Sequence, residues 1–285
     1  MRSDQRIASR IGGVMTRIYL NTAAMALTIA LIQTPASAQS GRPTLHVNPR
    51  WKECSLQLDP SLTQSAWHQF TQEAGLVAYF RSLSDARPMG KGHFELSLLQ
   101  WKTGIDASDA AWNDTFVHPD STHWLTEGSG LAFPGLMARV GVTSKTDVGL
   151  YLTKNPGANY GFVGGQVQQN FFGDATKPWS AAARVSFVSL YGPDDLNLNV
   201  FGVDVLASRR FTLTRWAVVS PYAGASTYLS NSHEKTAAVS LDDEHVVGAQ
   251  AMMGASVQLS MARLSVEYNV SKVNSLSFKV GVGSR

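Results

Sequence analysis

Four neighbouring residues, His118, Asp120, Ser121 and His123, are of the types found in a hydrolase site. In such a site a serine needs a histidine to take its proton and an acid to orient that histidine. Close neighbours in sequence seldom face one another in that way, and no nucleophile-elbow motif surrounds Ser121. A hydrolase that uses His118, Ser121 and His123 is therefore kept as an alternative, and no catalytic residue is assigned.

The segment that contains them, residues 102–134, is long and irregular and also carries several carboxylates. Together with His118 and His123 these carboxylates could bind a divalent ion, but their spacing matches neither a calcium loop nor a zincin motif. A long loop is usually functional or disordered, and two tryptophans argue against disorder here. We expect a folded loop held by Trp112, Phe116 and Trp124, with no metal and no cofactor.

The strands that must position such a loop are clearest at the C-terminal end, from Ala262 to Gly283. Apolar and polar residues alternate there, and a period of two is that of a β-strand. One face of this pair of strands is wholly apolar and the other carries Arg, Glu and Lys, as in a wall between hydrocarbon and a polar interior. The apolar face comprises Leu264, Val266, Tyr268, Val270, Leu276, Phe278, Val280 and Val282.

Similar alternation extends over most of the chain, and Gly, Pro, Asn and Asp clusters separate the segments. Many strands, short turns and little helix indicate an all-β sandwich or barrel. Near Gly202 the alternation shifts by one residue, which predicts a bulge. Aromatic residues near strand ends, as in interfacial girdles, are Trp101, Trp179, Tyr191, Trp216, Tyr222 and Tyr228. The predicted strands are 75–83, 93–101, 135–143, 146–154, 160–172, 179–191, 196–209, 214–229, 244–259, 261–271 and 274–283.

The N-terminal residues 1–38 resemble a secretory signal peptide: arginines, an apolar run from Ala23 to Ile32, then Ala36-Ser37-Ala38. They carry four Arg and one Asp, so 20 basic and 20 acidic residues remain of the 24 and 21 in the full chain. A neutral mature chain argues against a nucleic-acid partner. The single cysteine, Cys54, excludes an intramolecular disulfide framework.

Residues 39–74 form a lead-in with one helix. Asp59 is predicted as its N-cap and Pro60 as its first residue. Apolar residues recur every four positions, which predicts a helix over 60–74 that ends at Gly75. We expect it on the periplasmic rim or as a cap on the first strand, in preference to a plug in the lumen. Residues 75–285 are then the barrel domain.

Without a long apolar run, the mature chain can cross a membrane only as a closed barrel. Single-chain bacterial barrels have even strand numbers and long outer loops, whereas eleven strands are predicted. The strand at 75–83 therefore needs an extra partner or is not part of the wall, and we expect an antiparallel barrel of 10–12 strands. A C-terminus in the periplasm places 102–134 and 230–243 outside.

Residues assigned to the inner face carry both signs of charge, which favours internal ion pairs in a filled or narrow lumen. General porins need about sixteen to eighteen strands to leave an aqueous channel. The predicted lumen network consists of Glu95, Arg139, Arg184, Asp204, Arg263, Glu267 and Lys279.

The signal peptide, the alternating strands and the C-terminal strand Ser275–Gly283 resemble outer-membrane β-barrel proteins of Gram-negative bacteria. The resemblance implies export to the outer membrane, contact with lipid and lipopolysaccharide, and use of the barrel-assembly machinery. Such barrels commonly end on an aromatic residue, whereas this chain ends Val282-Gly283-Ser284-Arg285.

The resulting hypothesis is a non-enzymatic barrel with a structural or narrow-channel transport role, its permeant unidentified. Two alternatives stay open: a membrane-embedded lipid- or lipopolysaccharide-modifying hydrolase, and a soluble periplasmic β-sandwich that binds a ligand.

Overall fold

The computed structural model describes residues 55–106, 108–117, 131–154, 157–174 and 177–284. The chain divides into two units, 1–41 and 42–285, and every described residue belongs to the second. The predicted signal peptide, Cys54 and the candidates His118, Asp120, Ser121 and His123 lie outside the described residues.

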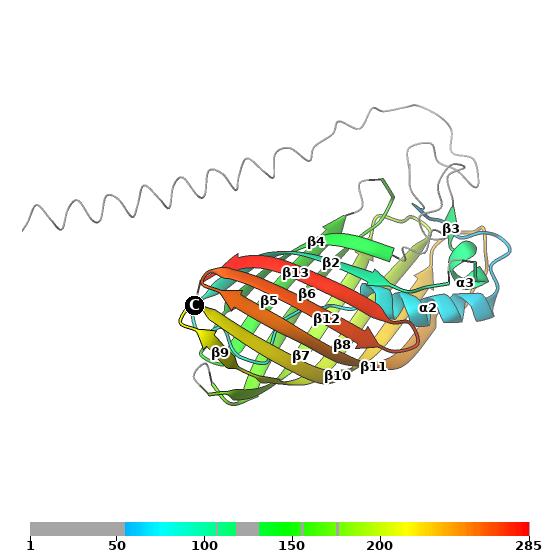
Figure 1. Ribbon diagram of the computed structural model, residues 1–285. Coiled ribbons are helices and arrows are strands. Elements are labelled where there is room, and N and C mark those ends of the chain that lie inside the picture. Colours follow the sequence, from blue (N-terminus) through cyan, green and yellow to red (C-terminus); the bar gives the residue numbers. More distant parts are fainter. Residues whose placement is uncertain (1–54, 107, 118–130, 155–156, 175–176, 285) are drawn as a thin grey trace, which may run out of the picture. The chain divides into compact units, whose positions relative to one another are not determined.

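In the described part of the chain ten antiparallel strands close a barrel (Figure 1). Neighbours in sequence are neighbours in the wall, β13 pairs with β2, and β10 pairs with β11, which leaves no open edge. The wall consists of β2 (Phe94–Thr103), β4 (Leu131–Gly141), β5 (Thr146–Lys154), β6 (Gly161–Phe172), β7 (Trp179–Tyr191), β8 (Leu196–Arg209), β10 (Ala217–Glu234), β11 (Glu244–Leu259), β12 (Ala262–Val270) and β13 (Ser275–Gly283). A short strand β9 (Phe211–Thr214) pairs with the start of β10.

The predicted all-β barrel of 10–12 strands with a short helix is confirmed, and the closed wall excludes the β-sandwich alternative. The strand predicted at 75–83 is wrong, because the first wall strand begins only at Phe94. Residues 75–78 end a helix, and the residues that follow run through the barrel lumen.

That helix, α2 (Gln64–Ala78), begins later than the sequence predicts. Its N-cap is Thr63, whose side chain accepts from the Ala66 N–H at 3.3 Å. Asp59 instead closes the preceding turn through Ser61. The helix continues past Gly75 to Ala78, and its C-cap is Tyr79. A Cβ at Gly75 would lie 2.7 Å from Ser230 Cβ, so the missing side chain lets the helix approach β10.

A small cap surrounds α2 at the mouth where β2 ends. It contains the strand pair β1 (Ser55–Leu56) and β3 (Phe116–Val117) and the short helix α3 (Ala110–Asn113). Aromatic rings join these pieces: Phe70 of α2 lies 5.2 Å from Trp112, which lies 6.0 Å from Phe116. The helix therefore lies at the mouth that carries segment 104–130, at the opposite end of the barrel from the C-terminus (Figure 1). The helix is thus at a rim of the barrel and not a plug deep in the lumen, and the side of the membrane that this rim faces stays a prediction.

After α2 the chain crosses the lumen as an extended segment, Tyr79–Met89, which we call the lumen segment. Every one of its residues is buried. It leads to the other mouth, where Gly90 and Gly92 adopt φ values of 88° and 81° and turn the chain into β2. Leu83 has a φ of 45°, a left-handed conformation that is rare for bulky residues and costs on the order of 1–3 kcal/mol unless the surroundings hold it.

The outer face of the barrel is apolar, as the alternation predicts. Leu264, Val280 and Phe278 of the C-terminal strands are 40%, 57% and 52% exposed. Of the residues predicted to form girdles, Trp179 and Trp216 are at least half exposed, as outward-facing girdle residues must be, whereas the prediction is wrong for Trp101, Tyr222 and Tyr228, which point inward and are buried. No described helix is long and apolar enough to cross a membrane.

The bulge predicted at Gly202 is wrong, because β8 keeps an unbroken register with both neighbours there. Leu196, Leu198 and Val200 point inward, where the helical cap makes that end of the lumen apolar, and Val203 and Val205 point outward. The shift in the pattern therefore records a change of environment along one inward face. Within the pairings described, the irregularities lie at Asn170/Phe172 and at Ala217/Val218.

Candidate functional site: the filled lumen

The lumen segment pairs with no strand that the structure describes. Polar side chains of the wall instead form hydrogen bonds with its backbone. Ser208 Oγ accepts from the Ala86 N–H at 3.2 Å, and Asn170 Nδ2 donates to the Ala86 carbonyl at 3.1 Å. Lys279 Nζ donates to the Ser82 carbonyl at 3.1 Å. Buried backbone groups need such partners, and these come from β6, β8 and β13, so the segment is held from several sides of the barrel.

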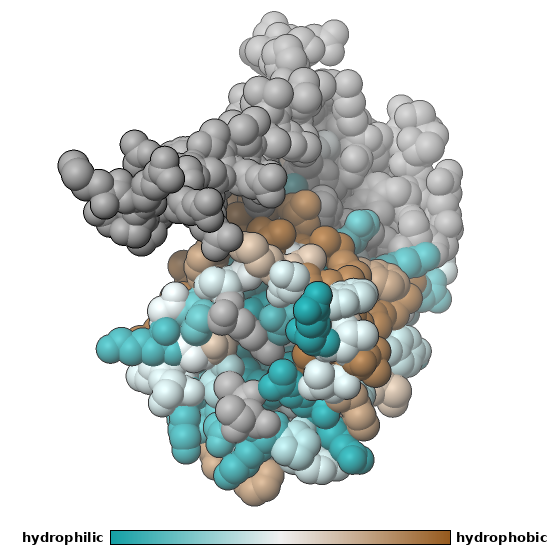
Figure 2. Space-filling view, turned by 60° about the vertical axis from the view of Figure 1, so that its left-hand side comes forward, coloured by the Kyte–Doolittle hydropathy of each residue, from teal (hydrophilic) through white to brown (hydrophobic). Residues whose placement is uncertain are grey.

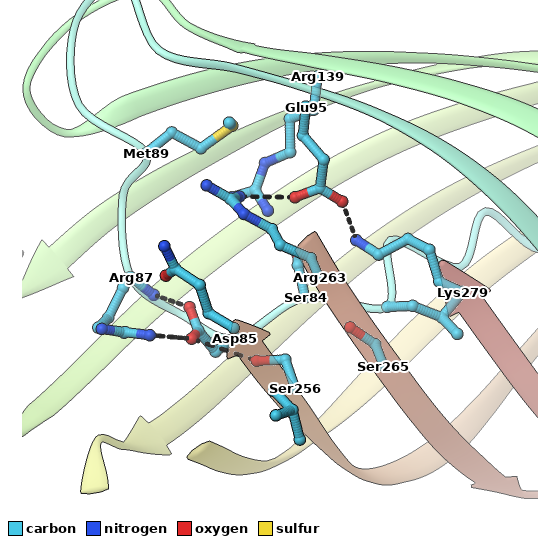
Figure 3. Close-up of a pocket in the computed structure, with 13 residues that line it drawn as sticks. Ser84, Asp85, Arg87, Met89, Glu95, Arg139, Ser256, Arg263, Ser265 and Lys279 are labelled. Atoms are coloured by element: carbon cyan, nitrogen blue, oxygen red, sulfur yellow. Dashed lines mark hydrogen bonds and ion pairs between the residues drawn. The ribbon is translucent and has the colours of Figure 1, made fainter. Parts of the chain in front are cut away.

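Near the mouth by the C-terminus the lumen holds a cluster of buried charges (Figure 3). Glu95 of β2 accepts from Lys279 Nζ at 2.6 Å through one oxygen and from Arg263 Nη1 at 2.6 Å through the other. Its side chain is 3% exposed, so the two cations compensate a carboxylate that would otherwise be costly to bury. The cluster ties β2, β12 and β13 together from inside.

Two further ion pairs lie beside this cluster, and hydrogen bonds from their members connect the lumen segment to the wall. Arg87 Nη2 lies 2.7 Å from Asp85 Oδ2 and also donates to Ser220 Oγ at 2.8 Å. Asp147 pairs with Arg139 at 2.5 Å and accepts from the Met89 N–H at 3.1 Å. The lumen segment thus contains one ion pair of its own, and its backbone donates a hydrogen bond to a second ion pair that belongs to the wall.

Towards the helical cap, Tyr79 and Arg81 anchor the start of the lumen segment. The Tyr79 hydroxyl donates to Asp204 at 2.5 Å, and Asp204 also pairs with Arg184 Nε at 3.0 Å. Gly202 makes room for this contact, since a Cβ there would lie 2.5 Å from the Tyr79 hydroxyl. Arg81 donates to the Leu76 carbonyl at 2.6 Å and to Ser275 Oγ at 2.9 Å, so it closes the C-terminus of α2 against β13.

The space left beside these side chains is small. The chamber lined by Asp85, Arg87, Glu95, Arg139 and Lys279 has a cavity of about 20 Å³, which is room for roughly one water molecule. The charged part of the lumen is therefore almost filled by side chains and by the lumen segment.

All seven residues of the predicted lumen network point inward and are buried. The structure brings Glu95, Arg263 and Lys279 into one cluster and Arg184 and Asp204 into another. Glu267 has no ion pair among the described residues and accepts from the Tyr222 hydroxyl at 2.9 Å, while Arg139 pairs with Asp147.

Sequence reasoning missed Tyr79, Arg81, Asp85 and Arg87, because residues 75–83 were predicted as a strand and residues 84–92 lie in the connection to the next predicted strand. Pro88 was the signal available, since proline is confined to edges and bulges of a sheet.

The described part of segment 102–134 has structural roles. Asp109 caps α3 by accepting from the Ala111 N–H at 3.0 Å and also accepts from Gln69 of α2. The Ser108 hydroxyl donates to Asp106 at 2.7 Å and lowers the pKa of this exposed carboxyl below its usual value. Within the described ranges no three His, Cys, Asp or Glu side chains form a group that could hold a metal ion.

No protein-family model matches the chain, and no curated protein matches it in sequence. Among solved structures, the translocator domain of the autotransporter NalP from Neisseria meningitidis is 10% identical, with a TM-score of 0.41 over 80% of this chain and all of that one. The N-terminal β-barrel domain of Pseudomonas aeruginosa OprF is 11% identical, with a TM-score of 0.28 over 68% and 99%. LpxR from Salmonella typhimurium is 11% identical, with a TM-score of 0.33 over 53% and 72%. At these values the likeness is confined to the barrel arrangement and says nothing about activity.

Proposed function

We propose that this protein is an outer-membrane β-barrel with a structural role, closed by its own lumen segment and by the α2 cap. The burial of every residue from Tyr79 to Met89 carries the proposal. A general porin has the opposite character, a wide strand ring around water.

Location in a membrane is supported by the outer face. Large apolar side chains are exposed around the wall, with Leu98, Leu150, Val205 and Val247 between 55% and 70% exposed. A closed barrel satisfies its backbone hydrogen bonds without water, which is the requirement for a strand protein in lipid.

The connections support an orientation. The mouth beside the C-terminus has short turns, such as 142–145 and 260–261, whereas the α2 mouth carries segment 104–130 and the connection 235–243. Because bacterial barrels have short periplasmic turns and longer outer loops, the α2 cap faces outside. The lumen segment then crosses the membrane so that the helix preceding it lies at the outer surface.

Conductance across planar bilayers tests the closed lumen. The unmodified protein is expected to give no steady current. A variant that removes three lumen contacts, Tyr79→Ala with Arg81→Ala and Arg87→Ala, is expected to show current steps, because each side chain fills space and holds the lumen segment. A matched control changes three exposed lysines of the mouth beside the C-terminus, Lys91→Ala, Lys145→Ala and Lys177→Ala, and should remain silent.

A folded band in unboiled detergent gels is required of each variant before its current is interpreted. Large, steady currents from the unmodified protein would contradict the proposal. Silence from the folded triple lumen variant would contradict the role of the lumen segment as the closure.

A further inference from the structure

A depression of about 310 Å³ lies at the mouth beside the C-terminus. The end of the lumen segment, the start of β10 and the turn between β11 and β12 meet there. Its lining includes Arg87, His93, Arg210, Arg215, Trp216 and Gln258. Three arginines and a histidine therefore line a single hollow, and no carboxylate is among the lining residues.

Arg87 and Arg215 have hydrogen-bonding capacity left for a ligand. Arg87 uses Nη2 and Nε on Asp85, while its buried Nη1 makes no hydrogen bond to any residue that the structure describes. Arg87 is 3% exposed and lines both the depression and the charged chamber behind it. Arg215 is exposed and forms no ion pair within the described ranges. A buried donor without a partner is costly, which favours a ligand for Arg87 from one of the two hollows that it lines.

The surroundings strengthen the positive potential at this mouth. Hydrophilic residues gather at this end of the barrel, and apolar residues cover the adjoining wall (Figure 2). The turns here carry Lys91, Lys145, Lys177 and Arg209, with Asp174 as the acidic residue among those described. The opposite mouth is acidic, with Asp194, Asp195, Asp242, Asp243 and Glu244. A recess lined by one sign of charge concentrates counter-ions.

Exposed apolar side chains place the depression at the level of lipid headgroups. Trp216 is 58% exposed, and Phe211 and Leu213 of the adjoining β9 are 41% and 66% exposed. Aromatic residues of this kind lie at the boundary between hydrocarbon and water. The anions available at that boundary are the phosphates of lipids and those free in solution.

We propose that the depression is a binding site for a phosphate group, held by Arg210, Arg215 and the free Nη1 of Arg87. The planar guanidinium presents paired N–H donors that match phosphate oxygens, and Trp216 covers the adjacent apolar part of the ligand. The phosphate comes from a lipid headgroup or from solution, and the experiment distinguishes the two.

The test uses the full chain purified in an uncharged detergent. The soluble probe is inorganic phosphate, titrated by calorimetry. The lipid probes are phosphatidylglycerol and diacylglycerol with the same acyl chains, whose retention is measured by native mass spectrometry. The site variant is Arg210→Gln with Arg215→Gln. The control, Lys91→Gln with Lys177→Gln, removes the same charge from the same mouth outside the lining.

The site variant is expected to weaken binding about tenfold or more, the effect of one lost charge-assisted hydrogen bond, while the control stays within about twofold. Preferential retention of phosphatidylglycerol alone identifies a lipid headgroup site, and binding of inorganic phosphate identifies a site open to the soluble ion. The proposal is overturned when the unmodified protein binds neither probe, or when the control loses as much affinity as the site variant.

Discussion

At the scale of single residues, the interior is organised by carboxylates that each serve more than one partner. Glu95 joins Lys279 and Arg263, and Asp204 joins Tyr79 and Arg184. Each of these groups is almost wholly removed from water. Loss of one member of a pair would therefore leave a buried charge without a counter-charge, which lowers the stability of the fold.

Glu95→Gln removes the carboxylate between two buried cations. We expect the free energy of unfolding to fall by about 3–5 kcal/mol, the usual cost of leaving a buried charge unpaired. Urea unfolding in lipid vesicles, followed by tryptophan fluorescence, measures the change.

Asp174→Asn is the matched control, since the Asp174–Lys177 pair is exposed and its atoms lie 3.9 Å apart. Surface pairs of this kind contribute about 0–1 kcal/mol. Equal losses in Glu95→Gln and Asp174→Asn would contradict a role for the buried cluster in holding the barrel.

At the scale of elements, α2 and the lumen segment act as one unit that crosses from mouth to mouth. Trp101 Nε1 donates to the Val77 carbonyl at 2.9 Å, and the Tyr228 hydroxyl donates to the Gln72 carbonyl at 3.0 Å. The helix is therefore attached to opposite parts of the wall, by β2 and by β10.

Gly75→Leu tests the close approach of α2 to β10. The added side chain would collide with Ser230 and Tyr228, so we expect a loss of about 1–3 kcal/mol and faster protease cleavage within the helix. Ser65→Leu adds a side chain of the same kind at an exposed position of the same helix and should leave the cleavage rate unchanged. A Gly75→Leu protein as resistant as the unmodified one would show that the helix has room at this position.

At the scale of the whole barrel, a ring of strands without an edge is joined from inside by buried ion pairs. Such a closed unit should resist detergent until it is heated. We expect the unboiled protein to migrate faster than the boiled protein in detergent gels and to occur in the outer-membrane fraction. Recovery in the soluble fraction with no mobility shift would contradict the membrane assignment.

The proposed orientation is tested by labelling single cysteines on intact cells in a Cys54→Ser background. Ser61→Cys, just before α2, should react with a membrane-impermeant maleimide, and Lys91→Cys, at the other mouth, should react only after the outer membrane is permeabilised. Both positions are exposed in the structure, so accessibility differs only through the side of the membrane. The reverse labelling pattern would show that the barrel has the opposite orientation in the membrane.

The wall could be predicted from the sequence because each strand has one face towards an apolar exterior and one towards a polar lumen, so apolar and polar residues alternate. The strands 179–191, 196–209 and 244–259 match β7, β8 and β11 in the structure to the residue. Inward charges such as Glu95 and Lys279 follow from the same alternation, so the composition of the lumen, though not its pairings, is readable from the chain.

What occupies the lumen was decided only by the tertiary structure. Residues 79–89 have no local pattern that distinguishes a wall strand from a strand without neighbours, because their polar partners come from other parts of the chain, on β5, β6, β8, β10, β11 and β13. The same reason explains the false helix end at Gly75, which is small because β10 approaches it, and such an approach leaves no periodicity in the sequence. The false bulge at Gly202 arose because the inward face of β8 passes from polar to apolar surroundings, which only the folded barrel shows.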